Sequence, residues 1–213
     1  MRSMFGQLMG DSRAVAYMEF ALATPAILIL FLYGGELANL AITHMRVSQI
    51  AHMTADNTTR VRDRIDEADV NEIFFGDKLS GDAFNLLQNG RIIISSIEDN
   101  DATPTNTADQ LITWQRCKGV KSVSSTYGAE GAVLSQAIGV GTRRIEAEPG
   151  EPIVAVEIQY DYKPLFTNKF FGPQTISYSY AYLLRDRSDN SLQNGGNLSG
   201  TAKATCNQYN ATF

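Results

Sequence analysis

Two glutamates, Glu19 and Glu36, stand at the two ends of an apolar run, and no charged residue lies between them. A carboxylate in a membrane helix is costly, by about 2.5–3.5 kcal/mol at the helix centre and less near its ends. The cost falls when the acid pairs with a positive group. We therefore expect Glu19 to have a functional role. For Glu36 the favoured explanation is contact with the lipid headgroups.

The side chains that usually carry catalysis or metal binding are few. The only histidines are His44 and His52, which lack further candidate ligands and are predicted to be surface or interface residues. Cys117 and Cys206 are too few for a zinc site, and in an exported domain such a pair favours one disulfide. No Gly-x-Ser-x-Gly motif or thiol–histidine pairing is present. We predict no enzymatic activity, metal, cofactor or small-molecule substrate.

The composition limits the size and the partners of the protein. Its 213 residues suffice for one membrane anchor and one modest domain. The net charge of -5 and the lack of a Lys/Arg cluster argue against binding to nucleic acid, which requires a basic patch.

The apolar run Phe20–Gly35 is best explained as a membrane span. As a helix it rises about 24 Å, so flanking residues must help to cross a hydrocarbon core of about 30 Å. A cleaved signal peptide requires a shorter run followed by a small-x-small site, and a buried core helix is usually less apolar. Arg2 and Arg13 precede the run, which predicts a cytoplasmic N-terminus and an exported C-terminal domain.

The helix is predicted to continue beyond the membrane. Small and apolar residues recur at alternating helical spacings, which predicts one helix of about 50 residues. Asp66–Phe75 either finishes this helix or forms a second one, and Ser80–Gly90 predicts a short helix closed by Gly90. The residues on the recurring face are Leu37, Leu40, His44, Val47, Ala51, Thr54, Thr58, Val61 and Ile65.

The second half of the chain has the alternation of β-strands. Short β-branched runs occupy Arg91–Ile97 and Leu111–Arg116, and longer alternating runs occupy Ile153–Tyr162 and Thr175–Arg185. The two longer runs are apolar on one side, which predicts a half-solvated antiparallel sheet of about four strands covered by the long helix. The predicted fold class is α+β.

The connector between the two longest strands is unusually apolar for a turn. It contains Leu165, Phe166, Phe170 and Phe171. These side chains either tuck under the sheet or form a contact patch for a partner.

The predicted organisation has five parts. The polar tail is expected to be flexible unless Cys206 ties it back to Cys117. The parts are a cytoplasmic leader (1–13), a transmembrane helix (14–43), a periplasmic helical extension (44–66), a periplasmic α+β domain (67–187) and the polar tail (188–213).

The sequence resembles a known family. Glu19-Phe20-Ala-Leu, Pro25 and Gly-Gly-Glu36 are similar in type and spacing to the TadE/TadG-like pseudopilins of tight-adherence (Flp, type IVc) pilus assembly. Three further segments are similar to segments of proteins in that family, and they extend the resemblance over most of the chain. They are Met45–Asn57, Trp114–Cys117 and Tyr160–Phe166.

The resemblance implies a pilin-like fold and a minor pilin-like structural subunit. Such subunits reside in the bacterial inner membrane with a periplasmic domain, and can be incorporated into a pilus. The implied partners are other pilin or pseudopilin subunits, the assembly machinery and a prepilin peptidase. The family's cut, carried onto this chain, falls between Ala14 and Val15 and places Glu19 fifth. The assembly residues that the resemblance implies are Glu19, which would mediate contact between subunits, Phe20, Pro25 and Glu36. The family usually has Gly where Ala14 stands, so an uncleaved TadG-type anchor, acting as a periplasmic scaffold or adhesin, is the alternative.

Overall fold

The computed structural model describes residues 12–100, 109–134, 137–140, 143–166, 171–185, 187 and 189–213. The chain forms two compact units. Unit 1 comprises the described residues of Met1–Ile42 and Pro164–Gly172, and unit 2 those of Thr43–Lys163 and Pro173–Phe213. Helix α2 contributes residues to both.

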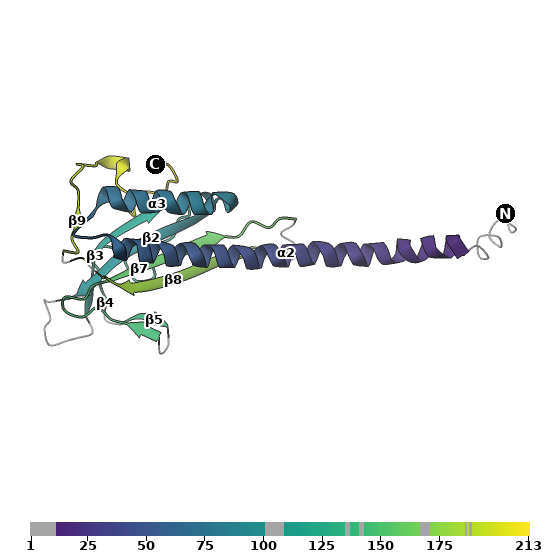
Figure 1. Ribbon diagram of the computed structural model, residues 1–213, viewed down its shortest axis with the longest axis horizontal. Helices are drawn as coiled ribbons and strands as arrows, with labels where there is room; N and C mark the ends of the chain where they lie inside the picture. Colours follow the sequence, from purple (N-terminus) through teal and green to yellow (C-terminus); the bar gives the residue numbers. More distant parts are fainter. Residues whose placement is uncertain are drawn as a thin grey trace. The chain divides into compact units, whose positions relative to one another are not determined.

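Helix α2 spans Ser12–Arg60, and its 49 residues confirm the prediction of one long N-terminal helix (Figure 1). It ends before the predicted limit of its stripe at Ile65. Asp63 adopts a left-handed conformation with a φ of 59°, which interrupts the helical path. The chain then enters the short strand β1, Ile65–Asp66.

Helix α3, Glu67–Gly81, is separate from α2 and begins at a capping box. The Asp66 carboxylate accepts a hydrogen bond from the Ala68 N–H at 2.9 Å, and the Asp69 carboxylate accepts one from the Asp66 N–H at 2.8 Å. These bonds satisfy amide groups that the first helical turn leaves free. Of the two alternatives for Asp66–Phe75, the structure has the second helix.

Two short helical turns follow α3. They are η1, Asp82–Phe84, and α4, Leu86–Asn89, where the sequence predicts one short helix. Gly90 follows α4 in an extended conformation. A Cβ atom at Gly90 would lie 2.7 Å from the carbonyl oxygen of Gln159. Glycine therefore allows the strand that begins at Gly90 to approach the strand that contains Gln159.

Five strands form an antiparallel sheet in the order β4-β3-β2-β7-β8. The four long strands match the predicted runs, and β4 is an additional short strand at the edge. The strands are β2 (Gly90–Asp99), β3 (Gln110–Lys118), β4 (Val133–Leu134), β7 (Ile153–Asp161) and β8 (Thr175–Leu183).

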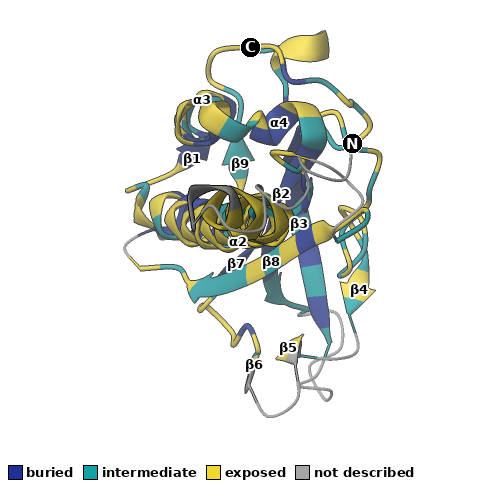
Figure 2. Ribbon diagram, turned by 90° about the vertical axis from the view of Figure 1, so that its right-hand side faces the viewer, coloured by how far each residue is buried: buried dark blue, intermediate teal, exposed yellow. Residues whose placement is uncertain are grey.

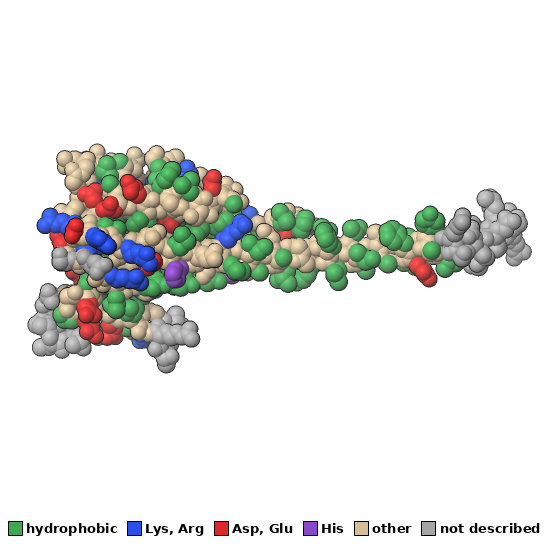
Figure 3. Space-filling view, viewed as in Figure 1, with side chains coloured by type: hydrophobic (Ala, Val, Ile, Leu, Met, Phe, Trp, Pro, Cys, Tyr) green, Lys and Arg blue, Asp and Glu red, His purple; other side chains and the backbone are tan. Residues whose placement is uncertain are grey.

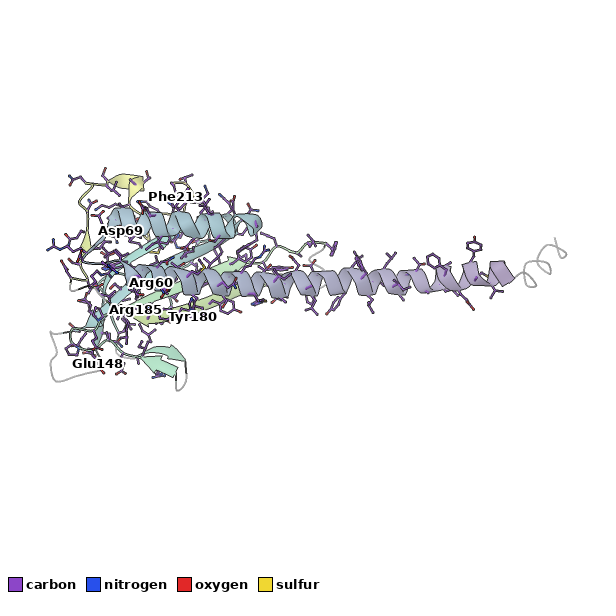
Figure 4. The ribbon with its side chains drawn as sticks, in the orientation of Figure 1. Arg60, Asp69, Glu148, Tyr180, Arg185 and Phe213 are labelled. Atoms are coloured by element: carbon purple, nitrogen blue, oxygen red, sulfur yellow. A yellow bond between two sulfur atoms is a disulfide. The ribbon has the colours of Figure 1, made fainter. Side chains whose placement is uncertain are left out.

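The part of α2 that belongs to unit 2 covers one face of this sheet, as predicted (Figure 2). The ring nitrogen Nδ1 of His44 lies 3.3 Å from the Tyr178 hydroxyl. The Ser48 hydroxyl lies 2.8 Å from that of Tyr180, which is labelled in Figure 4. The His52 ring packs edge-on against Tyr180. The alternating tyrosines of β8 therefore face the helix.

The opposite face of the sheet is covered at β7 but exposed at β8, where Thr175, Ser177 and Ser179 are exposed. The prediction of a half-solvated sheet is therefore wrong for β7 and confirmed for β8. Ala155 and Glu157, placed on the solvent side by the alternation of β7, are both buried. A second hairpin, β5 (Ile138–Val140) with β6 (Arg143–Ile145), contributes to this cover. The buried cluster on this face consists of Ile97, Ile112, Ile138, Ala147, Ile153 and Ala155.

The polar tail is tied to the sheet. Its two short elements are β9 (Leu192–Gln193), which pairs with β1, and η2 (Gly200–Ala202). The Cys117 N–H donates to the Ala204 carbonyl at 2.7 Å, and a disulfide joins Cys117 to Cys206. Of the two alternatives for the tail, the structure therefore has the tied-back one and not a detached segment.

Candidate functional site

The N-terminal part of α2 exposes an apolar surface on all sides. Its most hydrophobic 18-residue window has a mean hydropathy of 2.0 and is 0% buried, and by length and composition this helix can cross a membrane. Figure 3 shows hydrophobic side chains along it. The large exposed apolar residues are Val15, Tyr17, Met18, Phe20, Leu22, Ile27, Leu28, Ile29, Leu30, Phe31, Tyr33 and Leu37.

Three residues interrupt the apolar character of this helix. Glu19 is exposed, and its carboxylate forms no hydrogen bond or ion pair with a residue in the described ranges. The Thr24 hydroxyl donates to the Phe20 carbonyl at 2.6 Å, which satisfies it inside the helix. Pro25 has no N–H to offer the carbonyl four residues before it. Glu19 is thus the charged group that the apolar helix leaves without a described partner.

Residues Ala14 and Val15, between which the resemblance places a peptidase cut, lie in the first turn of α2. Val15 is exposed, and the side chain of Ala14 lies outside the described part.

Glu36 has a different position from Glu19, because it is fully buried. Its carboxylate accepts hydrogen bonds from the N–H of Leu165, at 3.0 and 3.2 Å, and from the N–H of Phe166 at 3.0 Å. Glu36 therefore fastens the connector to α2 inside unit 1. The sequence did not indicate this role, because the bonded residues are 129 and 130 positions apart.

The connector residues lie beside the end of the apolar run. Leu165 and Phe166 are exposed, and the Phe171 ring lies 5.0 Å from the Tyr33 ring. Phe170, the remaining member of the predicted contact patch, lies outside the described residues. Leu165 and Phe166 thus favour the contact patch over the alternative in which they tuck under the sheet.

The disulfide lies next to a buried arginine. The Arg91 guanidinium donates to the carbonyls of Cys206 at 2.6 Å, Gln208 at 3.0 Å and Gly119 at 3.3 Å, and it stacks 4.1 Å from the Tyr209 ring. Burial lowers the pKa of Arg91. This cluster holds the tail against the sheet and contains no nucleophile with a base beside it.

A polar cleft of about 710 Å³ lies in unit 2 beside strands β2 and β3. Arg116 binds Glu67 at 2.6 Å and Glu130 at 2.8 Å, and these partners raise its pKa although burial acts in the opposite direction. Arg187, whose pKa burial lowers, donates to the Asn190 side chain at 2.9 Å. Among the described residues, no His or Cys lines this cleft, and the lining residues Arg116 and Glu130 form an ion pair with each other.

The histidines and acidic groups do not form a metal site in the part of the chain that the structure describes. His44 is partly buried and His52 is exposed, and both contact tyrosines of β8 within unit 2. Asp77, which the sequence alone did not single out, is buried on α3 and hydrogen-bonded to Thr54 at 2.7 Å. The signal was available, since Phe74 and Asp77 lie on one buried helical face.

No family model, no curated protein and no solved structure matches this chain.

Proposed function

We propose that the chain is a membrane-anchored structural subunit of the minor pilin or pseudopilin type, which takes part in assembly of a tight-adherence type IV pilus. The observation that carries the proposal is the apolar surface of α2, whose most hydrophobic window is 0% buried. Such a helix is stable when lipid or neighbouring helices cover it. Glu19, Phe20 and Pro25 resemble the pseudopilin pattern, and this resemblance is the reason for proposing a tight-adherence pilus as the assembly.

The anchor crosses the bacterial inner membrane once, with the N-terminus in the cytoplasm. Arg2 and Arg13 before the apolar run support this orientation. Unit 2 then lies in the periplasm. The Cys117–Cys206 disulfide supports this location, because disulfides persist in oxidising compartments.

Glu19 mediates contact between subunits in this proposal. Its carboxylate has no partner among the described residues, and at the hydrocarbon boundary an unpaired acid is costly. The amino group of a neighbouring subunit offers the positive charge that offsets this cost. The neighbouring α2 helices bury the surface around Phe20 at the same time.

The test is the substitution Glu19→Ala in the full chain. We expect the variant to remain in the membrane fraction, since the apolar run is intact, and to be lost from piliated complexes. Glu72→Ala, which removes an exposed acid from α3, serves as the control and should assemble normally. Normal incorporation of Glu19→Ala into pili would show that Glu19 does not have this role.

A tethered binding module that never enters a fibre is the second candidate. The polar cleft of about 710 Å³ in unit 2 favours it, because such a cleft can accommodate a ligand. The mass of the mature protein separates the two candidates. An N-terminus at Val15 supports the pilin route, whereas an intact Met1 supports the static anchor.

A further inference from the structure

In the described part of the connector between β7 and β8, exposed apolar side chains are combined with backbone N–H groups that have partners. Leu165 is 64% exposed and Phe166 is 47% exposed. The backbone N–H groups of both residues donate to the buried Glu36 carboxylate. Side chains of this kind in a turn mark a contact surface. Here the backbone N–H groups of Leu165 and Phe166 have a partner within the protein, whereas their apolar side chains remain exposed and can contact lipid or another molecule.

The connector is attached to the last turn of the apolar run. A Cβ atom added to Gly35 would lie 3.2 Å from the Phe166 ring, so the ring packs directly on the helix backbone. The rings of Tyr33 and Phe171 are 5.0 Å apart. Leu165, Phe166 and Phe171 therefore lie level with the end of the apolar run.

We propose that Leu165, Phe166 and Phe171 of the connector enter the interfacial layer of the lipid bilayer beside α2, and that Glu36 holds Leu165 and Phe166 there. This inference rests on the proposed function, because it requires α2 to cross the membrane. Glu36 follows Glu19 by 17 residues (36 − 19), or about 25 Å of helix, so the two acids mark opposite faces of a hydrocarbon core of about 30 Å.

The chemistry of the connector fits lipid. Tyrosine concentrates at the headgroup level of membranes, where Tyr33 would lie. Leucine and phenylalanine are buried at the boundary between headgroups and acyl chains, where Leu165 and Phe166 would lie. Irregular backbone is tolerated near hydrocarbon only if its N–H groups have partners, and Glu36 supplies them for Leu165 and Phe166. The exposed surface of Leu165 and Phe166 is also continuous with the exposed apolar surface of α2, and one bilayer would bury both surfaces.

A nitroxide spin label on Leu165→Cys tests the position of the connector. The two native cysteines form the disulfide, so the introduced thiol is the one available for labelling. The substitution keeps the backbone N–H that binds Glu36. In vesicles of phosphatidylcholine and phosphatidylglycerol, we expect the label to be relaxed by dissolved oxygen and protected from a water-soluble nickel chelate.

Two matched labels calibrate this measurement. Leu79→Cys on α3 replaces a leucine that is likewise 64% exposed, and its label should be accessible to nickel. Leu30→Cys reports on α2 itself and should be protected. The inference is overturned if the Leu165 label is as accessible to nickel as the Leu79 label while the Leu30 label is protected. If the Leu30 label is itself accessible, the membrane anchor fails, and the connector inference fails with it.

A second copy of the chain is the competing occupant of this surface. Protection of the Leu165 label from both oxygen and nickel, lost when the protein is diluted with lipid, would assign the surface to that copy and overturn the lipid inference. The role of Glu36 is tested by Glu36→Ala in the labelled chain. We expect the Leu165 label to gain nickel accessibility while the Leu30 label is unchanged, and Glu36→Gln to lie between Glu36→Ala and the parent. An unchanged Leu165 label in Glu36→Ala would show that Glu36 does not hold the connector.

Discussion

Two acids on the buried face of α3, Glu67 and Asp77, are held in different ways. The Glu67 carboxylate accepts hydrogen bonds from Nη2 of Arg116 at 2.6 Å and from Nε of Arg116 at 2.9 Å, so its negative charge is paired with a positive one. Asp77 receives the Thr54 hydroxyl on one oxygen, and its second oxygen is buried without a hydrogen bond among the described residues. Burial raises the pKa of Asp77 to about 7, against the effect of Thr54. Folding therefore favours the protonated form of Asp77.

We predict that Asp77→Asn removes a pH-dependent loss of stability. Asp77 has an ordinary pKa of 3.8 and a folded pKa of about 7, so the unfolded chain releases this proton first as the pH rises. The contribution of Asp77 to stability is thus fully present below about pH 4 and is lost by about pH 7. At about pH 8 the variant should have a free energy of unfolding roughly 1–3 kcal/mol higher than the parent.

Denaturant unfolding followed by the fluorescence of Trp114, the single tryptophan, measures this difference in the full chain. Glu72→Gln is the control, because Glu72 is an exposed acid on the same helix. A stability difference between Asp77→Asn and the parent that is the same at about pH 4 and about pH 8 would contradict the assignment.

At the scale of elements, the sequence predicted the helices and strands whose apolar residues recur at a regular spacing. The alternation of β7 and β8 gave their extents, and the tyrosines of β8 gave the face that α2 covers. Helix α3 could not be separated from α2 by periodicity alone, because the break depends on the conformation of Asp63 and the cap at Asp66. Local hydrogen bonds decided this boundary.

The spacing of apolar residues could not predict contacts between segments that are far apart in the sequence. The second cover of the sheet comes in part from the short hairpin of β5 and β6, whose sequence has no long alternation. The bonds from Leu165 and Phe166 to Glu36 join residues with no local relation. The sequence accordingly predicted candidate residues in the apolar run, at Glu19 and Glu36 and in the connector, whereas the contacts of Glu36 with Leu165 and Phe166 required the fold.

The pair Gly34 and Gly35 gives a matched test of how α2 and the connector pack within unit 1. A Cβ atom at Gly35 would meet the Phe166 ring at 3.2 Å, whereas one at Gly34 would meet nothing within 4 Å. Gly35→Leu should therefore displace the connector, and Gly34→Leu should not. Both changes have the same intrinsic effect on the helix, since each replaces a glycine in α2 by leucine.

Protease cleavage of the full chain in detergent micelles measures this displacement. We expect at least a several-fold faster cut within the connector for Gly35→Leu than for Gly34→Leu, because a side chain at Gly35 disrupts the packing that orders it. Equal rates for the two variants would mean that the contact between Gly35 and Phe166 does not order the connector.

At the scale of the whole molecule, the fold of unit 2 depends on where the tail is attached. The disulfide joins Cys117 to Cys206 across 89 residues of chain. Arg91 binds two carbonyls of the same tail, and the Gly119 N–H donates to the Asn210 carbonyl at 2.9 Å. The tail therefore has attachments besides the covalent one, and these three are on or next to strands β2 and β3, whereas the tail strand β9 pairs with β1.

We predict that replacing both cysteines, Cys117→Ala with Cys206→Ala, lowers the free energy of unfolding by about 2–5 kcal/mol without loss of the fold. The loss arises because the unfolded chain is freed from a long closed loop, and Arg91 retains its backbone partners in the folded state. Thermal unfolding with and without a reductant measures this effect. The reductant should lower the midpoint of the parent and leave that of the double variant unchanged, because the variant has no bond to reduce. An unchanged midpoint for the reduced parent would mean that Arg91 and the backbone bonds hold the tail without the disulfide.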